Sequence, residues 1–394
     1  MSFTKRHLEP ILRKRFQQAR SVYLFGPRQS GKTTLARHCF PEIPYVSLED
    51  PDARDYAKSD PKGFLNSFKT AAIIDEPQHF PDLFSYLQSE IDIRQKKFIL
   101  TSSQNFLLSS SISQSLAGRL SILNLMPMTM SERFKKPYSD LWQKIKQDEP
   151  SSPITELYEQ LLCGGYPEPV THKASREFWY SDYTRTYLER DVRQVINVQD
   201  MGTFQRFLKL SAGRSGQILN RSSLSNDSGI SETTCQRWLS ILEQSGLIFY
   251  SAPYHNNFNK RITKSPKIYF WDTGLLCHLL GIRTTEHLHQ HPLYGAIIET
   301  HVVAEIRKNF LNAGIEEPTF HWRDQQGEEI DLILEHNGVP IPIEIKAGQT
   351  IASSMLKSLE KWQITTQHAQ NVLFYGGATS QKRNNTHIQP IGVL

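Results

Sequence analysis

The chain has 394 residues, of which 38% are hydrophobic and 22% are charged, and its formal net charge is +5. Single hydrophobic cores stop growing at roughly 250 to 300 residues, so this length predicts two to four domains. The composition is typical of a soluble globular protein, and no apolar run approaches the roughly 18 residues that would indicate a membrane span. With no signal peptide and no CxxC pair, the cysteines are expected to be buried thiols in the cytoplasm: Cys39, Cys163, Cys235 and Cys277.

The first twenty residues carry the whole net charge of the chain. Leu8, Ile11, Leu12 and Phe16 recur at helical spacing, which predicts an amphipathic helix with a solvated basic face. A basic segment can also lie along nucleic-acid phosphates, and the sequence leaves both interpretations open. Six basic residues are opposed only by Glu9 in this leader segment: Lys5, Arg6, Arg13, Lys14, Arg15 and Arg20.

Strand-like and helix-like segments alternate from residue 21 onward. Four runs are typical of strands: SVYLF (21–25), YVSL (45–48), AAIID (71–75) and KKFILTSS (96–103). Helices are expected from Gly31 and near 81–93. Strands separated by helices predict parallel β-α-β units, so we assign residues 1–135 to an α/β domain. The polar run at 134–153 indicates its end.

The run GPRQSGKTT at 26–34 contains the full pattern G-x-x-x-x-G-K-[ST] between a predicted strand and a predicted helix. Its glycines turn backbone N–H groups toward phosphates, its lysine supplies charge to the β- and γ-phosphates, and its hydroxyl binds magnesium. These roles fall to Gly31, Lys32 and Thr33. The predicted nucleotide-binding residues are the whole run: Gly26, Pro27, Arg28, Gln29, Ser30, Gly31, Lys32, Thr33 and Thr34.

Polar residues stand at the ends of the third and fourth predicted strands. Behind a phosphate loop, Asp75 is expected to hold Mg²⁺ and Glu76 to orient or deprotonate the attacking water. The alternative is an ordinary solvated loop start. Ser103, Gln104 and Asn105 end the following strand at the same edge, where one of them could sense the γ-phosphate.

Two arginines are candidates for an arginine finger, which stabilises charge in the transition state of phosphoryl transfer. Arg119 lies in SLAGRL, and Arg28 lies inside the phosphate loop. Either could instead form a structural ion pair.

Residues 136–205 are predicted to form a helical connecting region that contains the loop CGGYPEP. Within 206–283, a helix, a turn at Gly229, an N-cap at Ser231 and a second helix ending at Gly246 precede two strands, LIFYSAP and PKIYFWD. That order is typical of a winged helix-turn-helix. A helical hairpin acting only as a spacer is the alternative, because the residues available to read DNA are few: Thr233, Thr234, Gln236 and Arg237.

The run EEIDLILEHNGVPIPIEIKAG at 328–348 predicts two strands joined at Asn337-Gly338, a strong signal for a two-residue hairpin. This register places Asp331 opposite Glu344. Facing carboxylates repel each other unless a cation lies between them, and oxygen ligands this close suit Mg²⁺ or Mn²⁺. Lys346 follows one step along the strand, where it could steady a hydroxide or a developing negative charge.

Glu299 is a third candidate acid. It lies on the apolar stripe of a predicted helix in YGAIIETHVVAEIRKNF, so it is expected to face inward, where an unpaired charge is costly. The alternatives are an ordinary helix glutamate and a surface strand pair neutralised by Lys346.

The ordered motifs resemble a known family, the prokaryotic AAA-type ATP-binding proteins whose C-terminal domain of unknown function is similar to the PD-(D/E)XK, or restriction-endonuclease-like, fold. The runs that carry the resemblance extend from VYLFGPRQSGKTTLA through IIDEPQ, SLAGRL, CGGYPEP, PKIYFWDTGLL and GAIIETHVVAEI to GEEIDLIL and PIEIKAG. The resemblance implies ATP binding through Gly31, Lys32 and Thr33. It also assigns a nuclease-like site in 284–394 to Glu299, Asp331, Glu344 and Lys346. TSSQ departs from the Thr-Gly-Ser that is more frequent in the family.

The expected architecture is α/β and multidomain: an AAA-type P-loop NTPase with a parallel sheet, a helical and winged-helix region, and a restriction-endonuclease-like α/β domain. The expected function is ATP binding and hydrolysis by a protein that acts on nucleic acid, with DNA favoured over RNA. The expected cofactor is Mg²⁺, with Mn²⁺ as an alternative at the C-terminal site. The sequence is also compatible with a homo-oligomer. The alternative is an ATP-switched DNA-binding regulator or scaffold whose nuclease-like domain is not catalytic; a small-molecule kinase ranks third. The expected catalytic residues are Glu76, Arg119, Glu299, Asp331, Glu344 and Lys346, and the expected metal ligands are Thr33, Asp75, Asp331 and Glu344.

Overall fold

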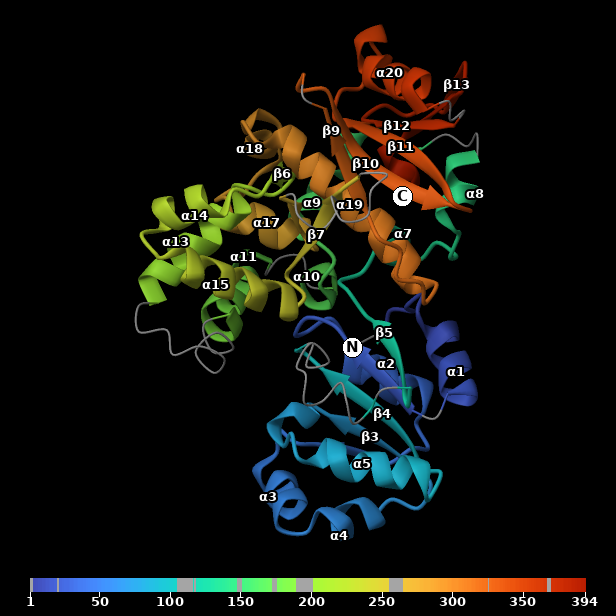
Figure 1. Ribbon diagram of the computed structural model, residues 1–394, viewed down its shortest axis with the longest axis vertical. Helices are drawn as coiled ribbons and strands as arrows, with labels where there is room; N and C mark the ends of the chain where they lie inside the picture. Colours follow the sequence, from blue (N-terminus) through green and yellow to red (C-terminus); the bar gives the residue numbers. More distant parts are fainter. Residues whose placement is uncertain are drawn as a thin grey trace. The chain divides into compact units, whose positions relative to one another are not determined.

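The computed structural model describes residues 3–19, 21–104, 116, 118–146, 151–171, 176–188, 201–254, 265–324, 326–366 and 370–394. Arg20 and Asn105, which the sequence analysis singles out, lie outside these ranges. The chain divides into two compact units (Figure 1). The first comprises Met1–Met128, Leu242–Leu247 and Leu311–Ile315, and the second comprises Thr129–Ile241, Ile248–Phe310 and Glu316–Leu394.

The first unit is built on a parallel five-stranded sheet in the order β2-β3-β4-β1-β5. Its strands are β1 (Ser21–Phe25), β2 (Tyr45–Ser47), β3 (Ala71–Asp75), β4 (Lys97–Ser102) and β5 (Leu120–Asn124). The first four confirm the predicted strands. The sequence pattern does not predict β5, because this strand lies at the edge of the sheet and most of its residues are only partly buried.

Helices cover this sheet: α1 (Glu9–Gln18), α2 (Lys32–Cys39), α3 (Pro51–Ser59), α4 (Pro61–Asn66) and α5 (Leu83–Asp92). The predicted amphipathic helix is confirmed as α1, since Leu8 and Leu12 are fully buried and Ile11 and Phe16 pack against the same core. The predicted helices near Gly31 and 81–93 are confirmed as α2 and α5. Figure 1 shows α3, α4 and α5 gathered beside β3.

The second unit contains a mixed nine-stranded sheet in the order β13-β14-β12-β11-β10-β9-β7-β8-β6. The strands are β6 (Gln217–Ile218), β7 (Ile248–Pro253), β8 (Lys267–Phe270), β9 (Phe320–Arg323), β10 (Glu329–His336), β11 (Val339–Lys346), β12 (Asn371–Tyr375), β13 (Gln381–Arg383) and β14 (Thr386–Pro390). Because β7 pairs with both β8 and β9, this one sheet contains strands from both predicted segments, 206–283 and 284–394.

The α-helices after residue 128 are mostly short. They are α7 (Met130–Arg133), α8 (Leu141–Lys146), α9 (Tyr158–Cys163), α10 (Pro167–Thr171), α11 (Arg176–Asp182), α13 (Met201–Ala212), α14 (Arg221–Ser228), α15 (Glu232–Gln244), α17 (Thr273–Leu279), α18 (Thr285–Gln290), α19 (Tyr294–Asn312) and α20 (Lys357–Thr366). No helix in the described ranges is long and apolar enough to cross a membrane. All four cysteines are buried thiols that form no disulfide among the described residues, as expected.

The predicted helix-turn-helix segment has the expected local signals. Helix α14 ends at Gly229, which adopts a left-handed φ of 72°, and the Ser231 hydroxyl accepts the Thr234 N–H at 3.1 Å at the start of α15. Gly246, with φ 68°, follows the end of α15. The element order is α13, β6, α14, α15, β7 and β8, and β8 pairs antiparallel with both β6 and β7.

The hairpin prediction is confirmed. Asn337 and Gly338 have φ values of 54° and 77°, the left-handed pair that a two-residue hairpin turn requires. The cross-strand pairs run from Leu332 with Ile343 to His336 with Val339, which is the predicted register. These strands, β10 and β11, therefore carry Asp331 and Glu344 near one end of the hairpin.

The CGGYPEP loop is held by Asp272, the last residue of the predicted strand PKIYFWD. The buried Asp272 carboxylate accepts the Gly165 N–H at 2.6 Å, the Tyr180 hydroxyl at 2.8 Å and the Leu275 N–H at 2.8 Å at the start of α17. At Gly274 a Cβ would lie 2.2 Å from the Tyr180 hydroxyl oxygen, so glycine is needed there. These two motifs therefore have a structural role in the second unit.

Candidate functional site

The phosphate loop connects β1 to α2 at the carboxyl edge of the parallel sheet. Gln29 and Gly31 have φ values of 61° and 94°, so the loop turns twice through left-handed backbone. The N-cap residue of α2 is Gly31, which has no side chain to cap the helix, and the N–H groups of the first turn point to the open end of the helix. At Gly26 a Cβ would lie only 2.1 Å from the Leu125 carbonyl oxygen, so the loop must begin with glycine.

Lys32 folds back onto this loop. Its ammonium donates to the Gly26 carbonyl at 2.9 Å and to the Pro27 carbonyl at 3.0 Å. The side chain is buried, with a relative exposure of 5%. A buried ammonium that donates to loop carbonyls is well placed to meet an incoming anion, because desolvated charges interact strongly.

Asp75, at the end of β3, accepts hydrogen bonds from hydroxyl groups of the neighbouring strands and of α2. Both carboxylate oxygens lie 3.1 Å from the Thr33 hydroxyl, and one lies 3.1 Å from the Tyr45 hydroxyl. The Thr101 hydroxyl, from β4, also donates to Asp75. Burial raises the pKa of Asp75 above its usual value, and the Glu76 charge adds to this shift, whereas the hydroxyl donors oppose it.

Glu76 follows Asp75 in left-handed backbone with φ 52°. Its carboxylate accepts the Ser103 N–H at 3.1 Å and the Ser103 hydroxyl at 3.0 Å. The Gln78 amide also donates to it, and the Ser102 hydroxyl donates to the Gln78 carbonyl oxygen at 2.8 Å. The predicted strand-end residue Ser103 is thus brought to Glu76, whereas Gln78 is a partner that the sequence analysis missed.

The two candidate arginine fingers both form ion pairs. Arg28 lies 3.5 Å from a Glu49 carboxylate oxygen. The Arg119 guanidinium contacts Asp92 Oδ2 through Nε at 2.8 Å and through Nη2 at 2.7 Å.

Arg119 precedes β5 directly, and β5 starts level with the first residue of β1. It therefore lies at the amino edge of the sheet, about 16 Å by strand geometry from the edge that carries the phosphate loop. This arrangement corresponds to the ion-pair alternative, and a finger role would have to act on another copy of the chain.

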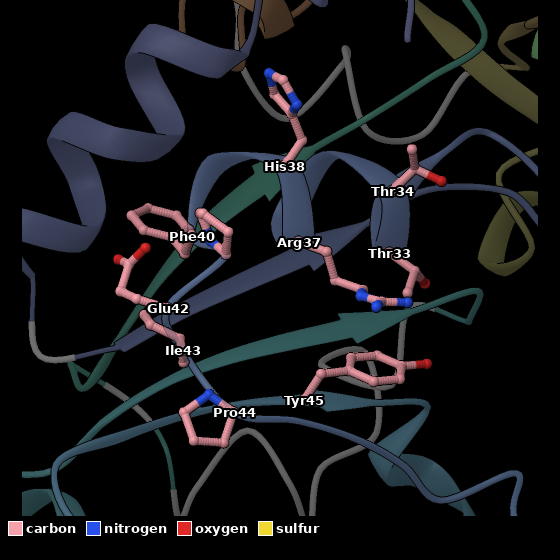
Figure 2. A pocket seen from close by; sticks show the side chains of 10 residues that line it. Thr33, Thr34, Arg37, His38, Phe40, Glu42, Ile43, Pro44 and Tyr45 are labelled. Carbon is pink, nitrogen blue, oxygen red and sulfur yellow. The ribbon is translucent and has the colours of Figure 1, made fainter. Parts of the chain in front are cut away.

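A pocket of about 650 Å³ adjoins the Asp75 cluster (Figure 2). Figure 2 shows the Arg37 side chain directed toward Tyr45, and its guanidinium carbon lies 5.0 Å from the Tyr45 ring centroid. Burial, together with Asp75, raises the pKa of Tyr45 to about 12, so its hydroxyl is protonated at neutral pH. The pocket is lined by Thr33, Thr34, Arg37, His38, Phe40, Pro41, Glu42, Ile43, Pro44 and Tyr45.

In the second unit, Asp331 and Glu344 converge on one lysine. The Lys346 ammonium lies 2.5 Å from Glu344 Oε2 and 3.4 Å from Asp331 Oδ2, which also accepts the Ile345 N–H at 2.9 Å. Glu344 is only 2% exposed, and its Oε1 atom has no hydrogen-bond partner among the described residues. A buried carboxylate oxygen without a hydrogen-bond partner is costly.

Glu299, on α19, has different partners. One of its oxygens accepts the Lys267 ammonium at 2.9 Å and the Tyr269 hydroxyl at 2.7 Å, and Lys267 also contacts Glu329. Lys267 is only 2% exposed. Lys267 is not among the residues predicted from the sequence, although Lys267 and Tyr269 alternate in PKIYFWD and so share one face of β8.

The acids of this cluster influence one another. Burial raises the pKa of Glu299 to about 7, and the Asp331 charge adds to the shift. Burial and Asp331 also raise the pKa of Glu344, against the opposing effect of Lys346. Within the described ranges, no three or more His, Cys, Asp or Glu side chains surround a common point that could hold a metal ion. The three acids therefore influence one another electrostatically but have different cationic partners: Glu299 pairs with Lys267, whereas Asp331 and Glu344 pair with Lys346.

The leader residues differ in their surroundings. Arg6 is buried, Arg13 donates to Glu9 and to the Cys39 carbonyl, and Lys5, Lys14 and Arg15 are exposed. In α15, the candidate DNA-reading residues Thr233, Gln236 and Arg237 are exposed, whereas Thr234 is half-buried.

Three family descriptions match parts of the chain. "AAA domain" matches residues 18–134, "Domain of unknown function (DUF8612)" matches 154–286, and "Domain of unknown function (DUF4143)" matches 294–394. Among solved structures, the Walker-type ATPase PABY2304 of Pyrococcus abyssi is 16% identical, with a TM-score of 0.46 over 69% of this chain and 94% of its own. A STAND protein with a tetratricopeptide repeat sensor, PH0952 of Pyrococcus horikoshii, is 16% identical, with a TM-score of 0.28 over 79% of this chain and 47% of its own.

Two curated relatives match over most of their length. "Uncharacterized protein Mb2031c" of Mycobacterium bovis and "Uncharacterized protein Rv2008c" of Mycobacterium tuberculosis are each 30% identical over 382 residues, which is 96% of this chain and 81% of theirs. The parallel sheet and the phosphate loop lie within the matched AAA domain. The chain therefore belongs to the family of these two mycobacterial proteins and carries an AAA-type ATPase domain near its amino end.

Proposed function

We propose that the first unit binds ATP with Mg²⁺ at the phosphate loop and hydrolyses it. The observation that carries this proposal is the contact between Asp75 and the Thr33 hydroxyl, 3.1 Å apart, beside the loop that contains Lys32. A carboxylate and a hydroxyl behind a phosphate loop are the groups that hold Mg²⁺ in P-loop NTPases. The donor set therefore fits this ion.

Each residue has a distinct task in the proposed reaction. Gly31 and the first turn of α2 present N–H groups to the phosphates, and Lys32 exchanges its loop carbonyls for phosphate oxygens. Glu76 orients the attacking water and takes its proton. Bound Mg²⁺ supplies positive charge to the β- and γ-phosphates.

Calorimetry of the full chain tests this proposal. ATP with Mg²⁺ is expected to bind with one site per chain, and omission of Mg²⁺ is expected to weaken ATP affinity. Absence of any heat or thermal stabilisation with Mg²⁺ and ATP would reject nucleotide binding.

A second candidate function is metal-dependent action on nucleic acid by the C-terminal cluster. The buried Glu344 Oε1 favours it, because this atom has no partner among the described residues and Asp331 lies nearby on the same lysine. Glu344 and Asp331 would hold the cation, which supplies a Lewis acid for phosphodiester cleavage. Lys346 would stabilise a hydroxide or a developing negative charge beside the two carboxylates. The order of α13, β6, α14, α15, β7 and β8 supports a winged helix as the DNA-binding element.

Glu344→Gln is expected to abolish stabilisation by Mn²⁺ or Mg²⁺ and any cleavage of plasmid or linear DNA. Without metal, the same substitution is expected to maintain or raise the melting temperature, because it removes a charge that burial and Asp331 disfavour. Thermal melts with and without each ion measure both effects.

Asp324→Asn is the matched control, since Asp324 directly follows β9 and pairs with Lys361 of α20 at 2.8 Å. This variant is expected to leave the metal response unchanged. Metal stabilisation without cleavage would support the alternative of an ATP-switched scaffold. Equal metal responses in wild type and Glu344→Gln would reject the metal site.

A further inference from the structure

Arg6 connects the leader segment to the phosphate loop. Its guanidinium donates to the Ser30 carbonyl at 2.9 Å through Nη1 and to the Met126 carbonyl at 2.7 Å through Nη2. The first carbonyl belongs to the phosphate loop, and the second lies two residues after β5. Among the described basic residues of the leader, Arg6 alone is buried, with a relative exposure of 4%. Its role is therefore internal to the first unit.

The Ser30 contact controls the neighbouring N–H group. The carbonyl of Ser30 and the N–H of Gly31 belong to one planar peptide unit, in which the two groups point in opposite directions. A donor fixed on the Ser30 oxygen therefore directs the Gly31 N–H away from Arg6. The positive charge also polarises the peptide, which makes that N–H a stronger donor.

The contact with the Met126 carbonyl fixes the other side of the Arg6 guanidinium. The segment that follows β5 already supports the start of the loop, because the Leu125 N–H donates to the Phe25 carbonyl at 2.7 Å and the Leu125 carbonyl closely approaches Gly26. Arg6 extends the same support from Met126 to Ser30. A planar guanidinium can serve both carbonyls at once, whereas an ammonium is a single point charge on a flexible stem.

We propose that Arg6 is a positioning residue of the phosphate loop, which holds the Ser30 carbonyl so that the Gly31 N–H faces the phosphates of ATP. This inference rests on the proposed ATP binding. Anchoring of the leader alone does not require a buried charge, because Leu8 and Leu12 already bury their side chains in the core. Burial of a guanidinium is costly unless its N–H groups are hydrogen-bonded, as those of Arg6 are by the Ser30 and Met126 carbonyls.

Arg6→Gln is expected to raise the Kd for ATP with Mg²⁺ about tenfold, which corresponds to about 1.4 kcal/mol. Arg13→Gln is the matched control. Arg13 also belongs to the leader and donates to a backbone carbonyl, that of Cys39, at the far end of α2. Calorimetric Kd values and melting temperatures without nucleotide are measured for both variants. A purely structural role would lower both melting temperatures and leave both Kd values unchanged.

The outcomes separate this inference from the proposed function. If wild type fails to bind ATP, the proposed function fails and the inference fails with it. If wild type binds ATP and Arg6→Gln matches it within twofold, only the inference is overturned. If Arg6→Gln does not fold, Arg6→Lys is compared with Arg13→Lys. Weaker ATP binding in Arg6→Lys alone supports the inference, and equal binding overturns it.

Discussion

Lys32→Ala is expected to lower ATP turnover by the full chain at least about 1,000-fold, which corresponds to about 4 kcal/mol of transition-state stabilisation. The substitution removes the ammonium that donates to the Gly26 and Pro27 carbonyls and that, in the proposed reaction, contacts the β- and γ-phosphates. Phosphate release at saturating ATP measures turnover, and calorimetry measures the accompanying loss of affinity.

Lys97→Ala is the matched control for this loss. Lys97 likewise donates to two backbone carbonyls, those of Phe16 at 3.1 Å and Gln17 at 3.0 Å. It starts β4 at the amino edge of the sheet, away from the phosphate loop. Lys97→Ala is expected to retain turnover, so a similar decrease in both variants would show that the effect of Lys32→Ala is structural.

Glu76→Gln is expected to lower turnover about 100- to 1,000-fold while the Kd for ATP stays within a few-fold of wild type. The amide can still accept the Ser103 N–H, but it cannot take a proton from water. The separation between binding and turnover distinguishes this variant from Lys32→Ala. Measurement of Kd and kcat on the same preparation checks it, and wild-type turnover in Glu76→Gln would remove Glu76 from the reaction.

Local signals account for the parts of the fold that could be predicted. Four strands of the parallel sheet, helix α2 and the 337–338 turn are encoded in runs of apolar residues and in short turn sequences. Such signals depend only on neighbours along the chain. Strand β5 lacks them, because it lies at an edge and is only partly buried.

Contacts between distant segments account for the parts that could not be predicted. Arg6 reaches Met126 across 120 positions, and Tyr45 reaches Asp75 from a neighbouring strand. Lys267 meets Glu299 through the packing of β8 and α19. The ion pair between Arg119 and Asp92 is a further example, since the sequence around Arg119 does not indicate which acid it contacts.

The two lysines of the C-terminal cluster bear directly on the scaffold alternative. Lys346 pairs with Glu344 and Asp331, and Lys267 pairs with Glu299, so the acids already have cationic partners. The metal response of Glu344→Gln therefore determines whether the cluster binds a cation in addition to these lysines.

Steady-state phosphate release by the purified full chain, with ATP and Mg²⁺, tests the central claim most directly. Release is expected to saturate with ATP, to stop when Mg²⁺ is chelated, and to fall to background in Lys32→Ala but not in Lys97→Ala. Wild-type release no faster than that of Lys32→Ala would contradict ATP hydrolysis at the phosphate loop.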